Sequence, residues 1–406
     1  MPASPSTARA INDRLALRLL QQEGPLTAGQ LKQLTGLSRP TVSDLVERLT
    51  ASGLIRVVGE SGEQRRGPNA RLYGIAADRA HLAALDVRTG GVLVLVSDLV
   101  GRVLAEVAVP IDADGGTGPA VEQAVAAVER AARKAGPDAW GALHTVGIGA
   151  PGLVDPATGD LRDSSGLPAW HRSLVAALQR RLPEARVTVE NETNLAALAE
   201  QREGAARDRD TFVLLWLGHG VGAAVVLDGR LRRGASGGTG EIGFLPVPGT
   251  GSLPSATDCD GGFHALAGAA AIGALARESG LPVGGPPDGP GAARVVAEAV
   301  AALEGDQGQA EAEADSPAAR FLGALADRLA IGAAAVTAIL DPGCVVLGGE
   351  VGQAGGAELA ARVAARLARM SPLPTEVRPS VLGGAAVLRG ALLTARDRAQ
   401  DELFAP

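Results

Sequence analysis

A helix-turn-helix pattern near the N-terminus most tightly constrains how this chain can fold. Thr27 and Gln30 have the spacing of a capping box, which predicts a short helix that ends at Gly36. Ser38 is the N-cap of a second helix, in which apolar residues recur at i, i+3, i+4 and i+7. These inward positions are Val42, Leu45, Val46 and Leu49. A helix of this kind, held by a preceding one, has the geometry that enters a DNA major groove.

A basic hairpin follows the second helix. Segments 54–58 and 71–75 read as strands, and the loop between them contains Gly, Pro and Arg. This pattern predicts the wing of a winged helix-turn-helix domain, whose arginines reach phosphates or an adjacent minor groove. The polar residues at the start of the second helix are expected to select the bases. The predicted DNA-binding residues are Thr27, Ser38, Arg39, Pro40, Thr41, Ser43, Asp44, Arg48, Arg65, Arg66 and Arg71.

Charge is distributed unevenly along the chain. Residues 1–80 contain 11 Lys and Arg against 7 Asp and Glu, whereas the whole chain has a net charge of −7. A positive N-terminal segment on an acidic body suits a protein that presents one end to nucleic acid. The expected partner is double-stranded DNA with an inverted-repeat operator, bound by a homodimer or homotetramer.

Composition also narrows the location of the protein. The chain has only two cysteines, which argues against a disulfide framework. No stretch approaches 18 uninterrupted apolar residues, and the N-terminus lacks the apolar core of a signal peptide. We therefore expect a cytoplasmic protein without a membrane partner.

From His81 onward the pattern changes to two successive βββαβα units, which predict a two-lobed α/β body with a cleft between the lobes. The expected strands are 82–87, 91–99, 102–109, 143–148 and 186–189, then 212–217, 221–227, 230–233 and 344–347. The expected helices are 11–23, 120–135, 169–182 and 194–204, with further helices from 263 and after 355. Segments 281–292 and 304–316 read as loops.

These patterns divide the chain into domains. The predicted parts are a disordered leader over 1–8, a winged helix-turn-helix domain over 9–78, a first lobe over 79–205 and a second lobe over 206–383. A C-terminal helix of about 384–400 is expected to return to the first lobe.

Four segments of the body resemble signature segments of the ROK family of repressors and sugar kinases. They are GIGAPGLVDPATGDL (147–161), VENETNLAALAE (189–200), LDGRLRRGASGGTGEIG (227–243) and VVLGGEVGQAG (345–355). The resemblance implies an α/β fold in which the N-terminal winged helix-turn-helix domain precedes a two-lobed actin-like ATPase fold. Regulators of the family carry such a winged helix, and the kinases lack it.

The phosphate-binding and catalytic motifs depart from the kinase pattern. The family's first phosphate loop has an Asp followed by a Gly-Gly-Thr turn, whereas here Asp86 is followed by Val87 and Arg88. The second loop, Gly-Thr-Gly in the family, has His219 in place of its Thr. The family's Asn-Asp pair is Asn191-Glu192, and a misplacement of about 1 Å in a catalytic group can cost roughly a hundredfold in rate. The sequence therefore predicts no kinase activity.

The family's zinc site is also missing. The position of its His is Phe244, and the segment that matches its cysteine run keeps only Cys259. A tetrahedral structural zinc needs four nitrogen or sulfur ligands. We expect no metal and no cofactor, and we expect Cys259 and Cys344 to be ordinary packed or partly exposed thiols.

The sugar pocket that the resemblance implies is partly altered. Gly166 replaces the family's Asn, and His264 replaces a Glu. Buried polar groups that lose partners discriminate against the original ligand. A different sugar or metabolite can use the polar residues that remain, or these residues can form a hydrogen-bond network at the lobe interface. The predicted effector-binding residues are Asn191, Glu192, Glu241 and His264.

The leading hypothesis is a DNA-binding regulator of carbohydrate or related metabolism, a repressor, with a non-catalytic body for effector sensing and oligomerisation. A second hypothesis is an active ATP-dependent sugar kinase with a DNA-binding domain. A third is a ligand-independent DNA-binding oligomer. The sequence leaves open the operator, the effector, and dimer against tetramer.

Overall fold

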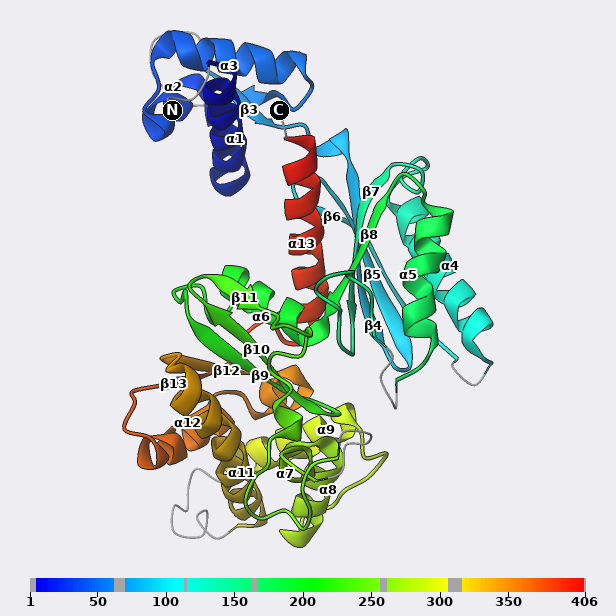
Figure 1. Cartoon of the computed structure of the whole chain (residues 1–406), viewed down its shortest axis with the longest axis vertical. Coiled ribbons are helices and arrows are strands. Elements are labelled where there is room, and N and C mark those ends of the chain that lie inside the picture. Colours follow the sequence, from blue (N-terminus) through cyan, green and yellow to red (C-terminus); the bar gives the residue numbers. More distant parts are fainter. Residues whose placement is uncertain are drawn as a thin grey trace.

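The computed structural model describes residues 5–61, 70–112, 115–162, 167–255, 261–305 and 316–404. It places a small N-terminal domain, called the head below, at one end of two α/β lobes (Figure 1). In the head, strands β1, β3 and β2 form an antiparallel sheet beside three helices. The elements of the head are α1 (Pro5–Glu23), β1 (Leu26–Thr27), α2 (Ala28–Thr35), α3 (Arg39–Ala51), β2 (Ile55–Glu60) and β3 (Arg71–Ile75).

The helix-turn-helix prediction is confirmed in detail. The Thr27 hydroxyl accepts a hydrogen bond from the Gln30 N–H, and the Gln30 side chain accepts one from the Thr27 N–H, which completes the capping box. Gly36 ends α2 in the left-handed conformation, with φ of 69°. Ser38 caps α3, and the four predicted apolar residues of α3 are buried. The turn between the helices is therefore fixed by local chemistry.

Two details of the predicted head need correction. Helix α1 begins at Pro5 rather than near Ile11, so residues 5–8 belong to a helix and not to a disordered leader. Residues 1–4 lie outside the described part of the chain, as do residues 62–69 of the predicted wing loop. The two strands of the wing, β2 and β3, are present and pair antiparallel.

The first lobe contains a five-stranded sheet in the order β6-β5-β4-β7-β8. Strands β4, β7 and β8 run parallel, and β5 and β6 are antiparallel neighbours. Helices α4 and α5 cover one face through a core of apolar side chains. The elements of this lobe are β4 (His81–Arg88), β5 (Gly91–Asp98), β6 (Val103–Pro110), α4 (Thr117–Ala135), β7 (Leu143–Ala150), α5 (Trp170–Arg181), β8 (Arg186–Asn191) and α6 (Glu192–Glu203).

The second lobe repeats the strand order of the first, as β11-β10-β9-β12-β13. The fifth strand, β13, was absent from the prediction. Segment 289–292, expected as loop, lies in the first turn of α9, and residues 306–315 of the second expected loop lie outside the described residues. The elements are β9 (Phe212–Leu217), β10 (Val221–Leu227), β11 (Arg230–Arg232), α7 (His264–Ala267), α8 (Ala269–Glu278), α9 (Gly289–Gly305), α11 (Pro317–Leu340), β12 (Cys344–Gly348), α12 (Gly349–Met370) and β13 (Glu376–Pro379).

Helix α11 is the one helix of the described residues that is long and apolar enough to cross a membrane, judged by length and composition alone. Its apolar residues, among them Phe321, Leu325 and Leu329, are fully buried in the core of the second lobe. A core helix of a globular lobe passes the same test of length and composition, and this packing accounts for its apolar sequence.

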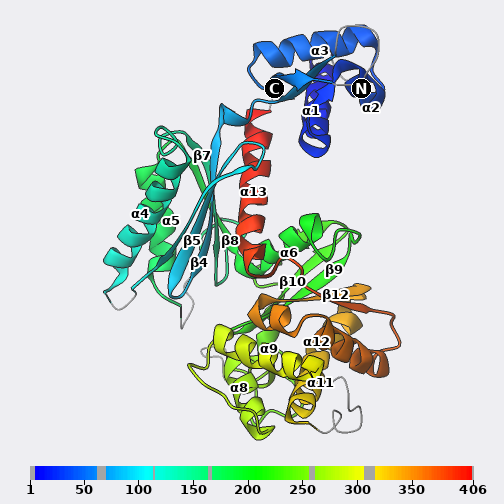
Figure 2. The same cartoon turned by 180° about the vertical axis from the view of Figure 1, so that it is seen from behind.

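The last helix, α13 (Ala386–Leu403), joins all three parts of the molecule (Figures 1 and 2). It packs against β4, β5 and β7 of the first sheet and against α6, which in turn packs on β9 and β10. Its C-terminal end meets the head, where Gln400 Nε2 donates to Gln21 Oε1 at 2.7 Å and Arg14 pairs with Asp401. One apolar cluster runs from the head through α13 and α6 to the second sheet.

Glu200 of α6 ties together the two segments that cross between the lobes. Its buried carboxylate accepts hydrogen bonds from Ala205 N at 2.6 Å, Leu382 N at 3.2 Å and the Ser380 hydroxyl at 2.5 Å. Ala205 lies on the first crossing and the other two residues lie on the second. Three donors satisfy the carboxylate and hold both crossings in one geometry.

Replacing Glu200 by Ala should therefore lower the free energy of unfolding by about 2–4 kcal/mol, because two backbone N–H groups and a hydroxyl lose their buried acceptor. Denaturant titration of the full chain measures this loss. The matched control is Glu203→Ala on the same helix, whose exposed pair with Arg389 should contribute about 0–1 kcal/mol. Equal losses in the two variants would contradict the role of Glu200.

Candidate functional site

The predicted DNA-reading face lies on the side of the head that points away from the lobes. Figures 1 and 2 both show α3 at this outer end. Arg39, Pro40 and Ser43 are exposed, and within the described residues Arg39 has no side-chain partner. The Ser38 hydroxyl lies 2.8 Å from the Thr41 hydroxyl and caps α3 through the Thr41 N–H. The start of α3 is thus ordered by its cap and open to solvent.

The other predicted DNA-binding residues divide into two groups. Arg71 is exposed at the start of β3, and within the described part of the chain it makes no ion pair. Arg48 instead donates to Asp13 of α1 at 3.2 Å and to Asp44 at 2.6 Å, and these carboxylates raise its pKa. The guanidinium of Arg48 therefore fastens α1 to α3, and this geometry disagrees with a role in DNA contact.

Thr27, Arg65 and Arg66 complete the predicted set. Thr27 is occupied as the cap of α2, although its position before the helix leaves it near the exposed surface. Arg65 and Arg66 lie outside the described residues.

The lobes meet at four carboxylates, named the interlobe cluster here: Asp86, Glu192, Glu241 and Glu350. Asp86, at the end of β4, is 3% exposed, and burial raises its pKa. Arg88 donates to it through Nε at 2.9 Å and through a terminal nitrogen at 2.7 Å. Arg88 also donates to the carbonyl of Gly384, just before α13, at 3.3 Å. The arginine that departs from the family's phosphate loop therefore pairs with the Asp of that loop.

Glu192 occupies the first turn of α6. Asn191 Oδ1 accepts from the N–H groups of Thr193 and Asn194 as the N-cap, and Asn191 Nδ2 donates to Glu192 at 2.9 Å. Burial raises the pKa of Glu192 to about 8, and the nearby charges of Asp86, Glu241 and Glu350 act in the same direction. At neutral pH this side chain is a neutral carboxylic acid that can donate a hydrogen bond as well as accept one.

His264 and Glu241 lie on the second lobe. His264 Nδ1 accepts from the Val221 N–H at 3.3 Å, so Nε2 carries the proton of the neutral ring. The ring stands edge-on to Phe244, with centroids 5.5 Å apart, and it rests against Gly243, where a Cβ would overlap it. Burial and the neighbouring His219 lower the pKa of His264, and desolvation raises the pKa of Glu241. His264 is thus neutral and locked in place two residues from the Glu241 turn.

The sequence analysis missed Glu350. Its carboxylate lies beside the turn Gly218–Gly220, where a Cβ on Gly218 would be 2.6 Å from Glu350 Oε2. A Cβ on Gly289 would also lie 3.4 Å from this carboxylate. The signal was present in the segment VVLGGEVGQAG, where a glutamate interrupts a run of glycines directly after a buried strand.

His171 is a second group that the sequence did not single out. It is 2% exposed, lies edge-on to Trp170, and has no hydrogen-bond partner on either ring nitrogen. Burial lowers the pKa of His171 to about 4. Among the described residues no group of three or more His, Cys, Asp or Glu side chains could hold a metal ion. Cys344 is buried and its pKa is raised, and Cys259 and Gly166 lie outside the described residues.

Comparisons with known proteins agree with this geometry. Residues 88–398 match the model of the ROK family, and residues 11–67 match the model of a MarR family. Over 249 residues the chain is 27% identical to the DNA-binding transcriptional dual regulator NagC of Escherichia coli, which covers 59% of this chain and 58% of that protein. It is 32% identical to a glucokinase of Thermotoga maritima over 52% of this chain and 65% of that enzyme. The chain thus spans about three fifths of the length of the curated regulator.

Solved structures extend the likeness to the whole chain. A ROK family transcriptional regulator, a homologue of the E. coli MLC protein, aligns over 98% of both chains with a TM-score of 0.74 and 21% identity. A ROK family glucokinase from Streptomyces griseus, solved with glucose and AMPPNP, aligns over 78% of this chain with a TM-score of 0.59 and 26% identity. The expected fold class, a winged helix-turn-helix domain before a two-lobed actin-like fold, is confirmed.

The raised pKa of Glu192 predicts a pH-dependent stability. The folded state favours protonated Glu192, so its contribution is complete below the unfolded pKa near 4.5 and is lost as the pH rises towards 8. Glu192→Gln stays neutral throughout. Between pH 5 and pH 8.5 the variant should gain about 1–3 kcal/mol relative to the wild type in denaturant titrations. A difference that does not change with pH would contradict the burial of an acid at this position.

Proposed function

This chain belongs to the ROK family, and from that premise we propose that it is a sugar-responsive DNA-binding transcription regulator whose body has no kinase activity. The observation that carries the proposal is the combination of an outward-facing helix-turn-helix with phosphate loops that Arg88 and Glu350 occupy. A regulator needs the first feature, and a kinase cannot use the second. The homologous regulators named above support the same conclusion.

The DNA-binding step would use the exposed start of α3. Arg39 and Ser43 face solvent at the outer end of the head, where a major groove can receive them. Arg71, at the start of the wing strand, would contact phosphates, with Arg65 and Arg66 of the same wing expected to contribute. Arg48 is left out of this proposed interface, because Asp13 and Asp44 already neutralise it.

The absence of kinase activity rests on electrostatics. Phosphoryl transfer needs backbone amides and cations around the phosphates of the nucleotide. Here the Glu350 carboxylate lies against the turn that resembles the second phosphate loop. Two like charges about 4 Å apart repel by about 4 kcal/mol at an effective dielectric constant of 20, and a triphosphate carries several charges. Arg88 does not offset this repulsion, because Asp86 already binds it.

The effector would bind between the lobes. A neutral Glu192 can donate to a sugar hydroxyl and accept from another, and Glu241 and the Nε2–H of His264 add an acceptor and a donor. Asn191 would act by holding Glu192 in place, because its amide is already hydrogen-bonded. A sugar or sugar derivative fits this set of donors and acceptors. The alternative, a satisfied network without a ligand, remains for experiment to separate.

The proposed assembly is a cytoplasmic homodimer or homotetramer that reads an inverted repeat. A single head covers one half-site, and two-fold symmetry would place the second head one helical turn or a multiple away. Repression of carbohydrate genes is the proposed outcome, as in the xylose repressor of Caldicellulosiruptor bescii, which is 25% identical over 59% of this chain.

Substitutions in the head test the DNA-binding proposal. Arg39→Ala should lower affinity for a selected genomic fragment by tenfold or more while leaving binding to scrambled duplexes nearly unchanged, because it removes base contacts worth about 1–3 kcal/mol. Arg71→Ala should weaken both duplexes alike and reduce the salt slope by about 1 per phosphate contact. Electrophoretic mobility shifts over a salt series measure both effects.

The control for these variants is Arg130→Ala, an equally exposed arginine on α4 of the first lobe. It should bind both duplexes as the wild type does. If the wild type retards no genomic fragment at low ionic strength, the DNA-binding proposal fails.

An ATP-coupled assay over a panel of hexoses tests the kinase alternative. We expect no turnover above the background of the Glu192→Ala protein, because the phosphate loops are occupied. The glucokinase of Thermotoga maritima serves as the positive control in the same assay. Turnover that Glu192→Ala abolishes would assign the body to the enzymes of the family.

A further inference from the structure

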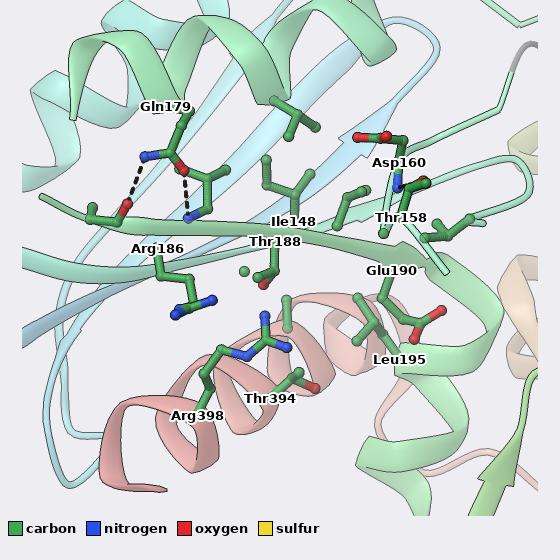
Figure 3. A pocket seen from close by; sticks show the side chains of 18 of the residues that line it. Ile148, Thr158, Asp160, Gln179, Arg186, Thr188, Glu190, Leu195, Thr394 and Arg398 are labelled. Carbon is green, nitrogen blue, oxygen red and sulfur yellow. Dashed lines mark hydrogen bonds between the residues drawn. The ribbon is translucent and has the colours of Figure 1, made fainter. Parts of the chain in front are cut away.

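A groove of about 810 Å³ lies on the first lobe, between the edge strand β8 and α13 (Figure 3). It lies apart from the interlobe cluster, and nothing argued above assigns it a role. On the α13 side its wall is formed by six polar residues, named the α13 groove here. They are His144, Arg186, Thr188, Thr394, Arg398 and Glu402.

The periodicity of two elements builds this wall. Ala391, Thr394, Arg398 and Glu402 follow one another along α13 at i, i+3, i+7 and i+11, so they share a face of the helix. Arg186, Thr188 and Glu190 alternate along β8 and share a face of the strand. The groove is therefore set by two rigid elements rather than by loops.

Positive charge is in excess at the centre of the groove. Arg186 pairs with Glu402 at 2.6 Å, whereas Arg398 makes no ion pair or hydrogen bond within the described residues. Figure 3 shows the guanidinium groups of Arg186 and Arg398 directed toward the same space beside Thr188. At the far end of the groove, Glu190 pairs with Arg233 at 2.7 Å and Asp155 pairs with Arg162 at 2.7 Å. Two cations thus share one carboxylate at the centre.

The remaining carboxylates of the groove, Glu184 and Asp160, lie in segments that flank β8 and β7. They make the groove as a whole mixed in charge. The unpaired guanidinium of Arg398 is the part that lacks a counter-charge, and guanidinium groups bind phosphate oxygens in a bidentate manner. The Thr188 hydroxyl, whose bond to the Val146 carbonyl is long at 3.4 Å, can turn toward a ligand.

We propose that the α13 groove binds a small phosphate-bearing ligand, with Arg186 and Arg398 holding the phosphate and Thr188 adding a hydrogen bond. The ligand is a free phosphate ion or a phosphate monoester. The volume of the groove exceeds the needs of a phosphate ion, which favours an ester that carries a polar organic group.

This site is connected to the head through α13. Glu402 and Arg398 lie within one turn of Gln400 and Asp401, which contact Gln21 and Arg14 of α1. A phosphate that draws Arg186 toward Arg398 would compete with Glu402 for the same guanidinium. The effect on DNA binding rests on the proposed function, but the binding itself does not.

Isothermal titration of the full chain with inorganic phosphate, a hexose 6-phosphate and the parent hexose tests the proposal without DNA. The hexose 6-phosphate should bind, and Arg398→Gln should weaken it by about tenfold or more, because one charge-assisted contact is lost. Arg130→Gln on α4 is the matched control and should bind as the wild type does. Tighter binding of the ester than of inorganic phosphate supports the ester, and equal binding supports the free ion.

Hydrogen–deuterium exchange locates the ligand. The ester should slow exchange in peptides that cover β8 and α13, and Arg398→Gln should remove this protection. The response to Glu192→Gln separates this site from the interlobe cluster, because that variant should bind the ester unchanged. The proposal is overturned if no phosphate compound binds at millimolar concentration, or if Arg398→Gln binds the ester as tightly as the wild type.

Discussion

The close approach of α13 to the first sheet is the contact on which the rest of the structure depends. A Cβ on Gly147 of β7 would lie 2.6 Å from the carbonyl oxygen of Ala391, and a Cβ on Gly149 would collide with Val387 and Leu195. Gly390 of α13 meets the backbone of Leu195 on α6 in the same manner. These glycines let three backbones touch, and so one helix can belong to both the core of the first lobe and the support of the head.

Periodicity and capping in the sequence predicted most of the helices and strands, because these signals are local. Strand β13 escaped prediction, since its four residues include Arg378 and Pro379 and it is a strand only by pairing with β12. The role of Glu200 escaped for a related reason, because its partners Ser380 and Leu382 lie about 180 residues away. Such pairings follow from the fold and leave no local trace.

The predicted sites were partly recoverable for the same reason. The i, i+4 spacing of Asp44 and Arg48 already indicated an ion pair on α3, whereas the stronger partner Asp13 comes from another helix. Between the lobes, the altered loops gave Arg88 and His219 from sequence, but the carboxylate of Glu350 needed the fold to bring it against Gly218. Like charges gathered at this junction keep Glu192 neutral, which changes it from a base into a donor.

Helix α13 has 18 residues, so it is about 27 Å long at a rise of 1.5 Å per residue. One end is anchored beside the clamp that Glu200 forms, and the other end holds the head. A rod of that length acts as a lever, so that a tilt of about 5° at the anchored end displaces the far end by about 2 Å. A small rearrangement near the lobes is thereby magnified at the surface that faces the duplex, without any change inside the head itself.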